Sequence, residues 1–554
     1  MSNGFKAEHQ TVKDIFTGSD DLRMPPYQRG YSWGEKEATE LVNDLREACS
    51  SERPYYFLGA MVIVQARPRE VMEIVDGQQR LATLSILFAV LRDMSESREE
   101  ANKLHELLEA PRGFMSSDRQ RWRLTLNHID TPFFREIVQR RGATSEADLY
   151  EPNTESRQNM LNNVNVFRDA LSNTSAAERS ALARFIMNEC VMVRVSVIDR
   201  DGGYAAFRVL NERGKKLSAH DILKSDLFER AGFTDEEAEA HAVTWNEIGA
   251  RLGSDGFDDL LKQIRSLFDK ASKEDMVTGF RNHVLPHISA RVFIEDRLQR
   301  YADAYEIIIG LRKTGTEFAP FLIHYINQLR ALDHVGWRAP ALKYLVDGDL
   351  EEKAATAFFR KLERLSFGLQ FTIPDRDARG RRYRRVITAI DDKQLHDENS
   401  PLDLTDDEKK RLAERLQGRF ATFRQRRAMS LRLNAVLPGG MSISPDADAT
   451  LEHILPRNPK ANSEWLKLWP KASERRELID CLGNFTLLTN AENQEADRQE
   501  YEDKLKVFFK NKTPSYALSE NLRDYKKWTP AAVRTRRDYF IALLCKEWDL
   551  PLPE

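Results

Sequence analysis

Short apolar runs near the amino end of the chain predict strands, and longer ones predict helices. Residues 55–65 and 71–75 are rich in branched or aromatic side chains, which is typical of buried strands. Residues 35–50 carry apolar side chains at helical spacing, and the apolar run from 81 to 94 has the length of a helix. We therefore expect strand, turn, strand, loop and helix in that order after the helix at 35–50.

Helical spacing then dominates as far as about residue 430. A branched, alternating segment at 190–198 predicts one more strand, and the breaks at 374–380 and 437–440 predict exposed loops or hinges. Thr405 and Glu408 have the spacing of a capping box at the start of a helix. The apolar stripes of these helices are expected to form a core.

Near the carboxyl end, residues 449–456 predict a short strand that ends at Glu452-His453 before a proline, and residues 482–488 predict a turn and a strand. A helix is expected to begin at Glu492-Asn493 and to carry Tyr501 and Lys504. Strands at both ends of a largely helical chain predict a mostly helical fold of the α+β class.

Length and composition restrict the class of protein. A chain of 554 residues predicts two to four domains, which we place at residues 1–230, 231–430 and 431–554. Hydrophobic and charged contents of 41% and 31% are those of a globular protein. The four cysteines are far apart, which argues against a disulfide scaffold or a thiolate zinc site. Since no apolar segment resembles a signal peptide or spans a membrane, the expected location is the cytoplasm and no membrane partner is expected.

The first candidate site is the polar segment Asp76-Gly77-Gln78-Gln79-Arg80, between a predicted strand and a predicted helix. The first amides of a helix lack an intrahelical acceptor and carry partial positive charge, which suits a phosphate that Arg80 could clamp. An ordinary surface turn with a helix cap is the alternative interpretation.

Two residues farther along the chain are candidates for the same ligand. One predicted helix ends near Asn211, and the next begins at residues 218–221 and carries Lys224. Both side chains could face the ligand of Arg80. As isolated residues they fit equally well as capping or surface groups.

The second candidate site is the pair Glu452-His453 at the end of a predicted strand. Hydrolysis of a phosphodiester needs a base to activate water and a divalent ion to stabilise charge, and His453 and Glu452 supply an imidazole and a hard oxygen ligand. Asn484 on the second strand would hold the His453 loop in register. Asn493 would bind the same metal as Glu452, and Lys504 would contact the phosphate. A structural histidine is the alternative interpretation.

Arginines cluster in two places although the net charge is only −3. The first cluster contains Arg381, Arg382, Arg384 and Arg385, and the second lies between residues 415 and 432. Such patches can bind a phosphate backbone, or they can be helix faces paired with nearby acids. The sequence leaves both interpretations open.

Several spaced motifs resemble the GmrSD family of modification-dependent restriction enzymes. The amino-terminal resemblance covers about residues 10–230 and rests on the segments at 26–33, 57–59, 76–80 and 210–228. It implies a ParB/sulfiredoxin-like α/β core that binds and hydrolyses nucleoside triphosphates. The implied nucleotide site is residues 76–80, with Tyr27, Gln28 and Arg29 beside it.

The carboxyl-terminal segment, about residues 431–550, resembles the HNH-like nuclease domain of the same family. Strand with Glu-His, strand with Asn and helix with Asn is the order of a ββα-metal site, and a central helical bundle that contacts DNA would connect the two ends. Glu492 and Asp497-Arg498, on either side of Asn493, depart from the family pattern. The resemblance implies one divalent metal, Mg²⁺ or Mn²⁺.

Together these features predict a DNA endonuclease that depends on, or is regulated by, a nucleoside triphosphate and acts on modified DNA in anti-phage defence. Its expected partners are modified phage or host DNA and the triphosphate, and a homodimer would suit double-strand cleavage. Glucosylated hydroxymethylcytosine and phosphorothioate linkages are both family possibilities, the latter in the related Ssp-type nucleases. The alternatives are a DNA-modification sensor with a vestigial nuclease and a triphosphate-hydrolysing regulator of a partner.

Overall fold

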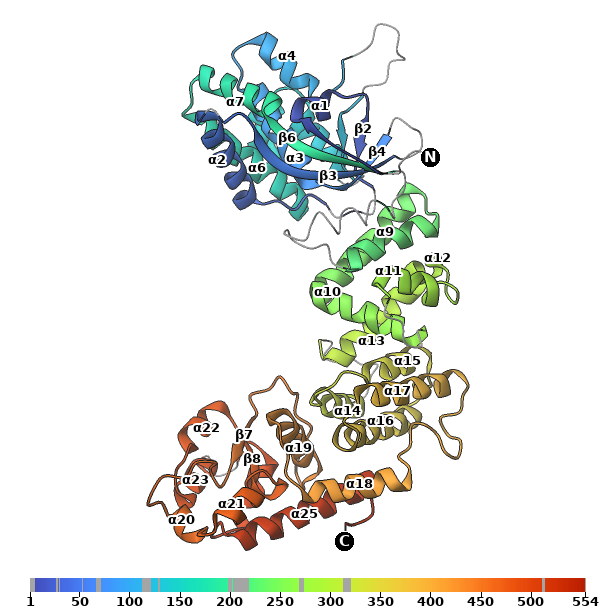
Figure 1. The fold of residues 1–554 in the computed structure, drawn as a ribbon, viewed down its shortest axis with the longest axis vertical. Coiled ribbons are helices and arrows are strands. Elements are labelled where there is room, and N and C mark those ends of the chain that lie inside the picture. Colours follow the sequence, from blue (N-terminus) through green and yellow to red (C-terminus); the bar gives the residue numbers. More distant parts are fainter. Residues whose placement is uncertain are drawn as a thin grey trace. The chain divides into compact units, whose positions relative to one another are not determined.

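The computed structural model describes residues 5–25, 28, 30–51, 53–65, 71–111, 121–127, 130–197, 202, 219–268, 274–311, 320–510 and 514–553. The chain divides into two compact units (Figure 1). The first contains Met1–Asp258 and Ile288–Glu295, and the second contains Asp259–His287 and Asp296–Glu554. Helices predominate and the strands form two separate sheets, which confirms the predicted mostly helical α+β fold. The division at residues 230 and 430 stays a prediction.

The described residues of the first unit form a six-stranded mixed sheet with the order β1-β6-β3-β4-β2-β5. Its strands are β1 (Phe5–Thr11), β2 (Asp21–Arg23), β3 (Tyr56–Gln65), β4 (Val71–Asp76), β5 (Leu124–Thr125) and β6 (Cys190–Val197). The predicted strands at 55–65, 71–75 and 190–198 are therefore confirmed. β3 pairs with β4 antiparallel and with β6 parallel, so these three form the centre of the sheet.

One helix of the first unit, α3 (Gln78–Asp93), is buried along almost its whole length. A helix that is apolar on every side belongs inside a core, and α3 packs against α4 (Arg98–Glu106), α6 (Glu155–Ser172) and α7 (Ala176–Asn188). The predicted amphipathic helix is α2 (Glu35–Ser50), which covers α6 and α7. The other helices of this part are α1 (Val12–Thr17), α5 (Asp130–Phe134), η1 (Arg135–Gln139), η2 (Ala143–Leu149), α9 (Ala219–Ala231) and α12 (Ala290–Val292).

The second unit begins with helices and ends with a small sheet among short helices. α10 (Asp235–Phe268) runs from the first unit into the second and breaks at Gly253. The helices that follow are α11 (Met276–Gly279), η3 (Phe280–Val284), η4 (Phe293–Arg297), α13 (Leu298–Ile309), α14 (Pro320–Arg330), α15 (Arg338–Asp347), α16 (Glu352–Thr372), α17 (Arg376–Asp391), α18 (Asp406–Gln417) and α19 (Phe423–Val436). The remaining elements are β7 (Thr450–His453), α20 (Glu464–Leu468), α21 (Ala472–Leu478), η5 (Leu482–Asn484), β8 (Phe485–Leu488), α22 (Asn490–Ala496), α23 (Tyr501–Phe508), α24 (Ala517–Glu520), η6 (Asn521–Asp524) and α25 (Pro530–Trp548).

Two of the three predicted helix boundaries in this unit agree with the structure. The Thr405–Glu408 capping box is present at the start of α18, and α19 ends just before the predicted loop at 437–440. The predicted break at 374–380 is mostly wrong, because α17 already begins at Arg376, with Asp375 as its N-cap.

A buried ion pair joins three helices of the second unit. Arg432 of α19 donates to Glu363 of α16 at 2.7 Å and to Glu547 of α25 at 2.8 Å, and the side chains of Arg432 and Glu363 are fully buried. Trp548 of α25 also donates its indole N–H to Glu363. This network fixes α25 against the helices that precede the small sheet.

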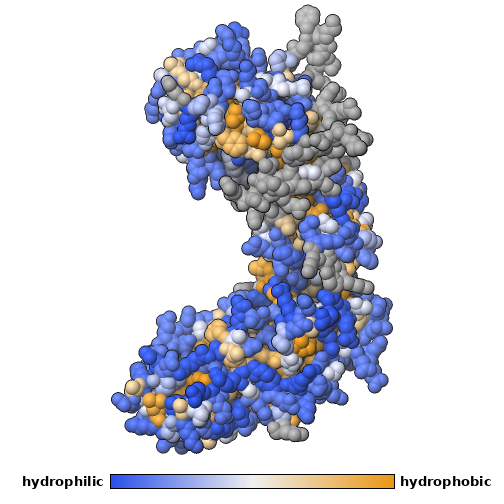
Figure 2. All heavy atoms as spheres, viewed as in Figure 1, coloured by the Kyte–Doolittle hydropathy of each residue, from blue (hydrophilic) through white to orange (hydrophobic). Residues whose placement is uncertain are grey.

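The surface carries mostly polar side chains. Figure 2 shows hydrophilic residues over most of the visible face of each unit, with apolar residues scattered among them. None of the helices in the described ranges is long and apolar enough to cross a membrane.

Candidate active site

Three of the residues predicted for the nuclease site line one cleft of the second unit. Glu452 and His453 come from the end of β7, and Asn493 comes from α22. The cleft has a volume of about 540 Å³, and its other lining residues are Pro456, Arg457, Asn458, Gln494, Asp497 and Arg498. Segments forty residues apart in the sequence therefore meet at one opening.

A hairpin-like pair of strands and one helix build this cleft. β7 and β8 pair antiparallel, with Glu452 opposite Thr486 and His453 opposite Phe485. Thr489 caps α22, and Glu492 completes a capping box with it. Two strands followed by a helix is the ββα order that the sequence predicted (Figure 1).

The polar Glu492, a departure from the family pattern, thus has a structural explanation. Its carboxylate accepts a hydrogen bond from the Thr489 backbone N–H at 2.9 Å, and the Thr489 hydroxyl accepts one from the Glu492 backbone N–H at 3.2 Å. Such a box satisfies helix amides that otherwise lack acceptors. It fixes the first turn of the helix that carries Asn493.

The prediction of one helix from Glu492 through Lys504 is wrong. α22 ends at Ala496, and Asp497 follows with φ 28° and ψ −122°, a conformation that turns the chain away from the helix axis. A second helix, α23, begins at Tyr501. The break returns Lys504 to the strand end, where it meets Glu452.

Lys504 is an internal partner of Glu452 in this structure. Its ammonium group forms an ion pair with the Glu452 carboxylate and donates to the His453 carbonyl oxygen at 3.0 Å. The Lys504 side chain is 0% exposed, so it presents no surface to the DNA phosphate that it was predicted to contact. Burial raises the pKa of Glu452 and lowers the pKa of Lys504. The charge of each partner opposes the shift of the other, so the charge of each group depends on the other.

The imidazole of His453 is held by packing and by one acid. Its ring lies edge-on to Phe485, with centroids 5.3 Å apart, and its Nε2 lies 3.2 Å from the Asp480 carboxylate. Burial lowers the pKa of His453 to about 4, against the opposing effect of Asp480. The ring is therefore neutral at pH 7 and has a nitrogen able to accept a proton.

Asp480 is a site residue that no motif marks in the sequence. It stands alone between α21 and η5, four residues before Asn484, and its side chain is 5% exposed. Its carboxylate accepts from Arg457 at 2.7 Å and from Arg419 at 3.0 Å, besides its contact with His453. Burial raises the pKa of this carboxyl, but these three partners outweigh it and lower the pKa to about 2.

Asn484 is fully buried and binds the loop that follows His453. Its side-chain oxygen accepts from the backbone N–H of Leu455 at 2.8 Å and from the Trp528 indole at 3.0 Å. Its side-chain nitrogen donates to the carbonyls of Leu455 at 3.1 Å and Ile479 at 3.0 Å. Since every polar atom of the amide is engaged by the protein, Asn484 acts on the position of the loop and has no contact with the cleft.

The donors at the cleft fit an oxygen-preferring cation that keeps most of its water. Glu452 offers a carboxylate of which one oxygen pairs with Lys504, and Asn493 offers an amide that has no hydrogen-bond partner in the part of the chain that the structure describes. Mg²⁺ commonly binds through one or two protein oxygens and several waters. Groups of three or more His, Cys, Asp or Glu side chains arranged to hold a metal are absent from the described residues, which disfavours a site made of such side chains alone.

The arginines of the first cluster differ in what they contact. Arg381 and Arg385 on α17 are exposed, and Arg384 is half-buried. Arg382, also predicted to bind DNA, instead donates to the carbonyl of Pro401 at 2.6 Å and pairs with Glu408 at 3.3 Å. It connects α17 to the start of α18, so the interpretation as a paired helix face holds for this residue.

The second cluster has both buried and exposed members, and Arg424 is 75% exposed beside Asp333. Arg426 and Arg432 are buried, and Arg427 donates to the carbonyls of Pro445 and Ala449. Arg419 remains 54% exposed beside Asp480. In this cluster the guanidinium groups are occupied by acids and carbonyl groups, as the alternative interpretation expected.

The predicted nucleotide loop joins β4 to α3 in the first unit. Gly77 is the N-cap of α3 and has φ 91°, a backbone conformation that residues with a side chain rarely adopt. A Cβ built on Gly77 would lie 3.0 Å from the Cβ of Met61. The first helical hydrogen bond runs from Leu81 to the Gly77 carbonyl, so the amides of residues 78–80 lack helical acceptors. The loop therefore directs N–H groups that lack helical acceptors away from the helix.

The polar side chains of this loop fall into two groups. Gln79 is buried and bonds to the segment at 30–32, since its oxygen accepts from the Ser32 N–H at 2.7 Å. Gln78 and Gln28 each have a buried side-chain oxygen without a partner in the described part of the chain, and Gln28 donates to the Ile74 carbonyl at 2.9 Å. The half-buried Asp76 ends β4, opposite Val62.

Arg80 lies beneath the backbone of β3. Its guanidinium donates to the Ala60 carbonyl at 3.3 Å and would lie 3.2 Å from a Cβ built on Gly59. Burial lowers the pKa of Arg80, and Asp76 opposes this effect. Placed there, the guanidinium would gain from an anionic ligand at the loop.

Of the remaining predicted nucleotide residues the structure describes Lys224, whose ammonium group already has a partner within the protein. Lys224 on α9 is buried and donates to the Asn246 side chain at 2.8 Å, and burial lowers its pKa to about 7. Tyr27, Arg29 and Asn211 lie outside the described residues. Their part in a nucleotide site stays a prediction.

Two family models match the chain, one at each candidate site. The N-terminal domain of GmrSD restriction endonucleases matches residues 12–228, and the C-terminal domain matches residues 382–543. The two matches follow the expected order and together cover well over half of the chain. The chain belongs to the GmrSD family of restriction endonucleases. No individual curated protein matches it.

Family membership makes this chain a DNA endonuclease and makes DNA its partner. The C-terminal match contains the whole cleft with Glu452, His453 and Asn493, and also Asp480. The N-terminal match contains the loop from Asp76 to Arg80. Each of the two matched GmrSD domains therefore contains one of the candidate sites described above.

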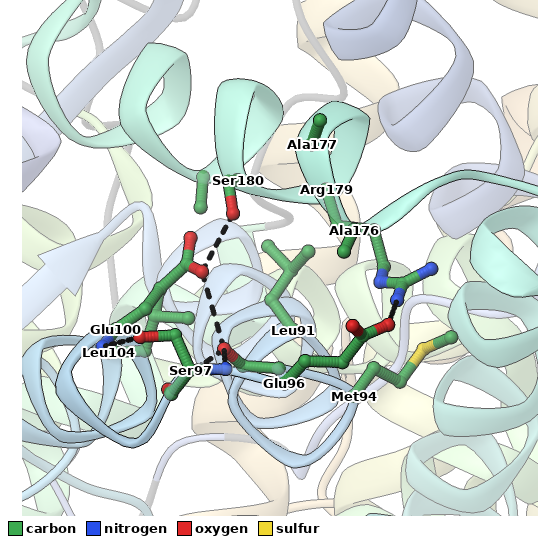
Figure 3. Close-up of a pocket in the computed structure, with 12 residues that line it drawn as sticks. Leu91, Met94, Glu96, Ser97, Glu100, Leu104, Ala176, Ala177, Arg179 and Ser180 are labelled. Atoms are coloured by element: carbon green, nitrogen blue, oxygen red, sulfur yellow. Dashed lines mark hydrogen bonds and ion pairs between the residues drawn. The ribbon is translucent and has the colours of Figure 1, made fainter.

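The first unit of this GmrSD chain has a further cavity, of about 180 Å³, between α3, α4 and α7 (Figure 3). Its carboxylates already have partners: Ser180 donates to Glu100 at 2.7 Å, and Arg179 pairs with Glu96 at 3.4 Å. The rest of its wall is largely leucine, methionine and alanine. Among the residues that the structure describes, none of those predicted to bind nucleotide or DNA lines it.

Proposed function

We propose that the second unit cleaves DNA by metal-dependent hydrolysis in the cleft at the end of β7. The observation that carries this proposal is the convergence of Glu452, His453 and Asn493 on one opening within the matched C-terminal domain. A bound divalent cation would supply charge stabilisation at the scissile phosphate and the leaving oxygen. Glu452 and Asn493 would hold it through oxygen atoms.

In this mechanism His453 accepts a proton from the attacking water. The ring is neutral at pH 7 because burial lowers its pKa to about 4, so a basic nitrogen is available without prior deprotonation. Lys504 keeps Glu452 and the His453 carbonyl in place, and Asn484 fixes the loop behind the ring. Arg457, which lines the cleft and is 49% exposed, is positioned to bind the phosphate.

The test is nicking of supercoiled plasmid with Mg²⁺ or Mn²⁺ by a His453→Ala variant. We expect the rate to fall by about 10²–10⁴-fold, the usual contribution of a positioned general base. The control is His396→Ala, which removes an exposed histidine of the same unit outside the cleft. Full cleavage by His453→Ala would overturn the assignment of His453 as the general base. It would mean that the cleft is a vestigial site and that cleavage occurs elsewhere.

We further propose that the loop from Asp76 to Arg80 binds a nucleoside triphosphate. Three features support this proposal: the amides at the start of α3 that lack helical acceptors, the buried guanidinium of Arg80, and the oxygens of Gln28 and Gln78, which have no partner among the described residues. They supply donors for phosphate and acceptors for hydroxyl or amino groups. The match to the N-terminal domain supports it as well. Hydrolysis of the triphosphate would then control access to the nuclease.

The test is binding of each of the four triphosphates by calorimetry to wild type and to Arg80→Ala. Loss of a bidentate phosphate contact should weaken binding by about 10-fold or more, since hydrogen bonds to charged groups contribute roughly 1.5–3 kcal/mol. Arg98→Ala removes an exposed arginine of α4 and serves as the control. Equal affinities in Arg80→Ala and wild type would show that the loop is not the binding site.

We propose finally that cleavage requires modified DNA and serves cytoplasmic defence against phage. Support comes only from the restriction-enzyme family, so the decisive assay compares matched DNAs that carry glucosylated hydroxymethylcytosine, phosphorothioate linkages or neither. Cleavage restricted to one modified substrate would identify the signal. Sedimentation of the DNA-bound protein would test the homodimer that cutting of both strands invites.

A further inference from the structure

One buried carboxylate connects the proposed general base to the charged rim of the cleft. Asp480 contacts His453 Nε2 at 3.2 Å through Oδ1, and the same oxygen accepts from Arg457 at 2.7 Å. Its other oxygen accepts from Arg419 at 3.0 Å. The buried Arg426 lies 3.5 Å away but is committed to the carbonyls of Phe420 and Ala421.

We infer that Asp480 is a positioning residue, which orients the His453 imidazole for proton transfer and holds the Arg457 guanidinium at the cleft to receive the scissile phosphate. The inference deepens the proposed nuclease mechanism and rests on it. Asp480 itself lies behind both groups, with a side chain that is 5% exposed, and does not line the cleft.

The chemistry of the contact determines which nitrogen of His453 is basic. An ionised carboxylate has no hydrogen to donate, so Nε2 must carry the hydrogen in the contact with Asp480. A neutral imidazole with a protonated Nε2 has a free lone pair on Nδ1. Asp480 therefore selects one tautomer and fixes the direction in which the ring accepts a proton.

Asp480 supplies one negative charge to two partly exposed arginines. Arg457 and Arg419 share one carboxylate and are 49% and 54% exposed, so two guanidinium charges face solvent with one negative charge behind them. An arginine anchored on one side and open on the other loses less conformational freedom when it binds a phosphate. Arg457 lines the cleft next to His453, where the phosphate would enter.

The first experiment is a double-mutant cycle on the single-turnover cleavage rate at saturating DNA, with His453→Ala, Asp480→Asn and the double variant. If Asp480 acts through His453, Asp480→Asn lowers the rate by about 10²-fold alone and adds no further loss to His453→Ala. Asp503→Asn removes an acid from an exposed pair with Lys506 and is the matched control. A further loss in the double variant would contradict the action of Asp480 through His453, and full activity of Asp480→Asn would overturn the whole inference. Full activity of His453→Ala would instead overturn the proposed function itself, in which His453 is the general base.

The second experiment needs no substitution at Asp480. In wild-type protein labelled with ¹⁵N-histidine at pH 7, the signals missing from His453→Ala should report a protonated Nε2 and an unprotonated Nδ1. The opposite tautomer would contradict the inference even if Asp480→Asn failed to fold.

The rim is tested separately with Arg457→Ala. This variant should weaken DNA binding and reduce the salt dependence by about one unit of slope, as expected for one lost phosphate contact. Arg411→Ala removes a similarly exposed arginine that pairs with Asp407 on α18 and should leave both unchanged. An unaltered salt slope in Arg457→Ala would remove the phosphate-holding role from Asp480.

Discussion

Glu452 and Lys504 form the ion pair on which the end of β7 depends. Lys504→Met should destabilise the second unit by about 3 kcal/mol or more, because it leaves a buried carboxylate without its partner. The measurement is the urea transition followed by tryptophan fluorescence, since Trp465 and Trp528 belong to the core beside this pair.

The matched control for that prediction is the double variant Glu452→Gln/Lys504→Met. Removing both charges avoids the uncompensated carboxylate, so its loss of stability should be smaller than that of Lys504→Met alone. If the single and double variants were equally unstable, the ion pair would not be the cause, and lost packing of the lysine stem would explain the result.

Candidate site residues could be predicted from the sequence where a motif contained them. The burial and the partners of a side chain could not. Glu452, His453 and Asn493 were predicted to form one site from the order of strands and helix, and the structure places all three along one cleft. The burial of Lys504 and Arg382 was missed, because it arises from contacts with elements distant in the sequence. Asp480 was missed because a single acid in a short linker gives no periodic signal.

At the scale of elements, the position of Asn493 depends on how α22 begins. Thr489→Ala removes the N-cap and the capping box, which should cost about 1 kcal/mol of stability and loosen the turn that carries Asn493. We expect cleavage to need a higher Mg²⁺ concentration, measured as the midpoint of a metal titration. Thr405→Ala breaks an equivalent box on α18, away from the cleft, and should leave that midpoint unchanged.

An unchanged midpoint in Thr489→Ala would mean that Asn493 does not bind the ion. A loss of maximal rate without a shift of the midpoint would point to His453 or its loop instead, because these act on the chemical step.

Element prediction succeeded for long or strongly apolar segments and failed for short polar ones. The strands β3, β4 and β6 and the helices α2 and α3 follow from apolar spacing. β2 and β5 have three and two residues, which are too few to show a period. β1 contains lysine, glutamate and histidine, so it lacks the apolar run that marks the other strands. The break at Asp497 was hidden because the residues on both sides favour a helix.

At the scale of the whole molecule, the two units carry one proposed site each, so control of cleavage by a triphosphate requires coupling between them. Coupling of two binding equilibria is reciprocal by thermodynamic necessity. A non-hydrolysable triphosphate should therefore change the affinity for modified DNA by the same factor by which that DNA changes the affinity for the triphosphate. We expect a factor of about 5–150, the usual range of coupling free energies of roughly 1–3 kcal/mol.

The measurement uses His453→Ala, which is expected to bind both ligands without cutting DNA. Each dissociation constant is determined alone and at a concentration of the other ligand that saturates His453→Ala. Arg80→Ala in the same background should reduce the mutual effect at that concentration, because it weakens triphosphate binding. If saturating triphosphate left the DNA affinity unchanged, and DNA left the triphosphate affinity unchanged, the two units would act independently in binding. Triphosphate control would then have to operate on the cleavage step, where a dependence of the single-turnover rate on triphosphate in the wild-type protein would reveal it.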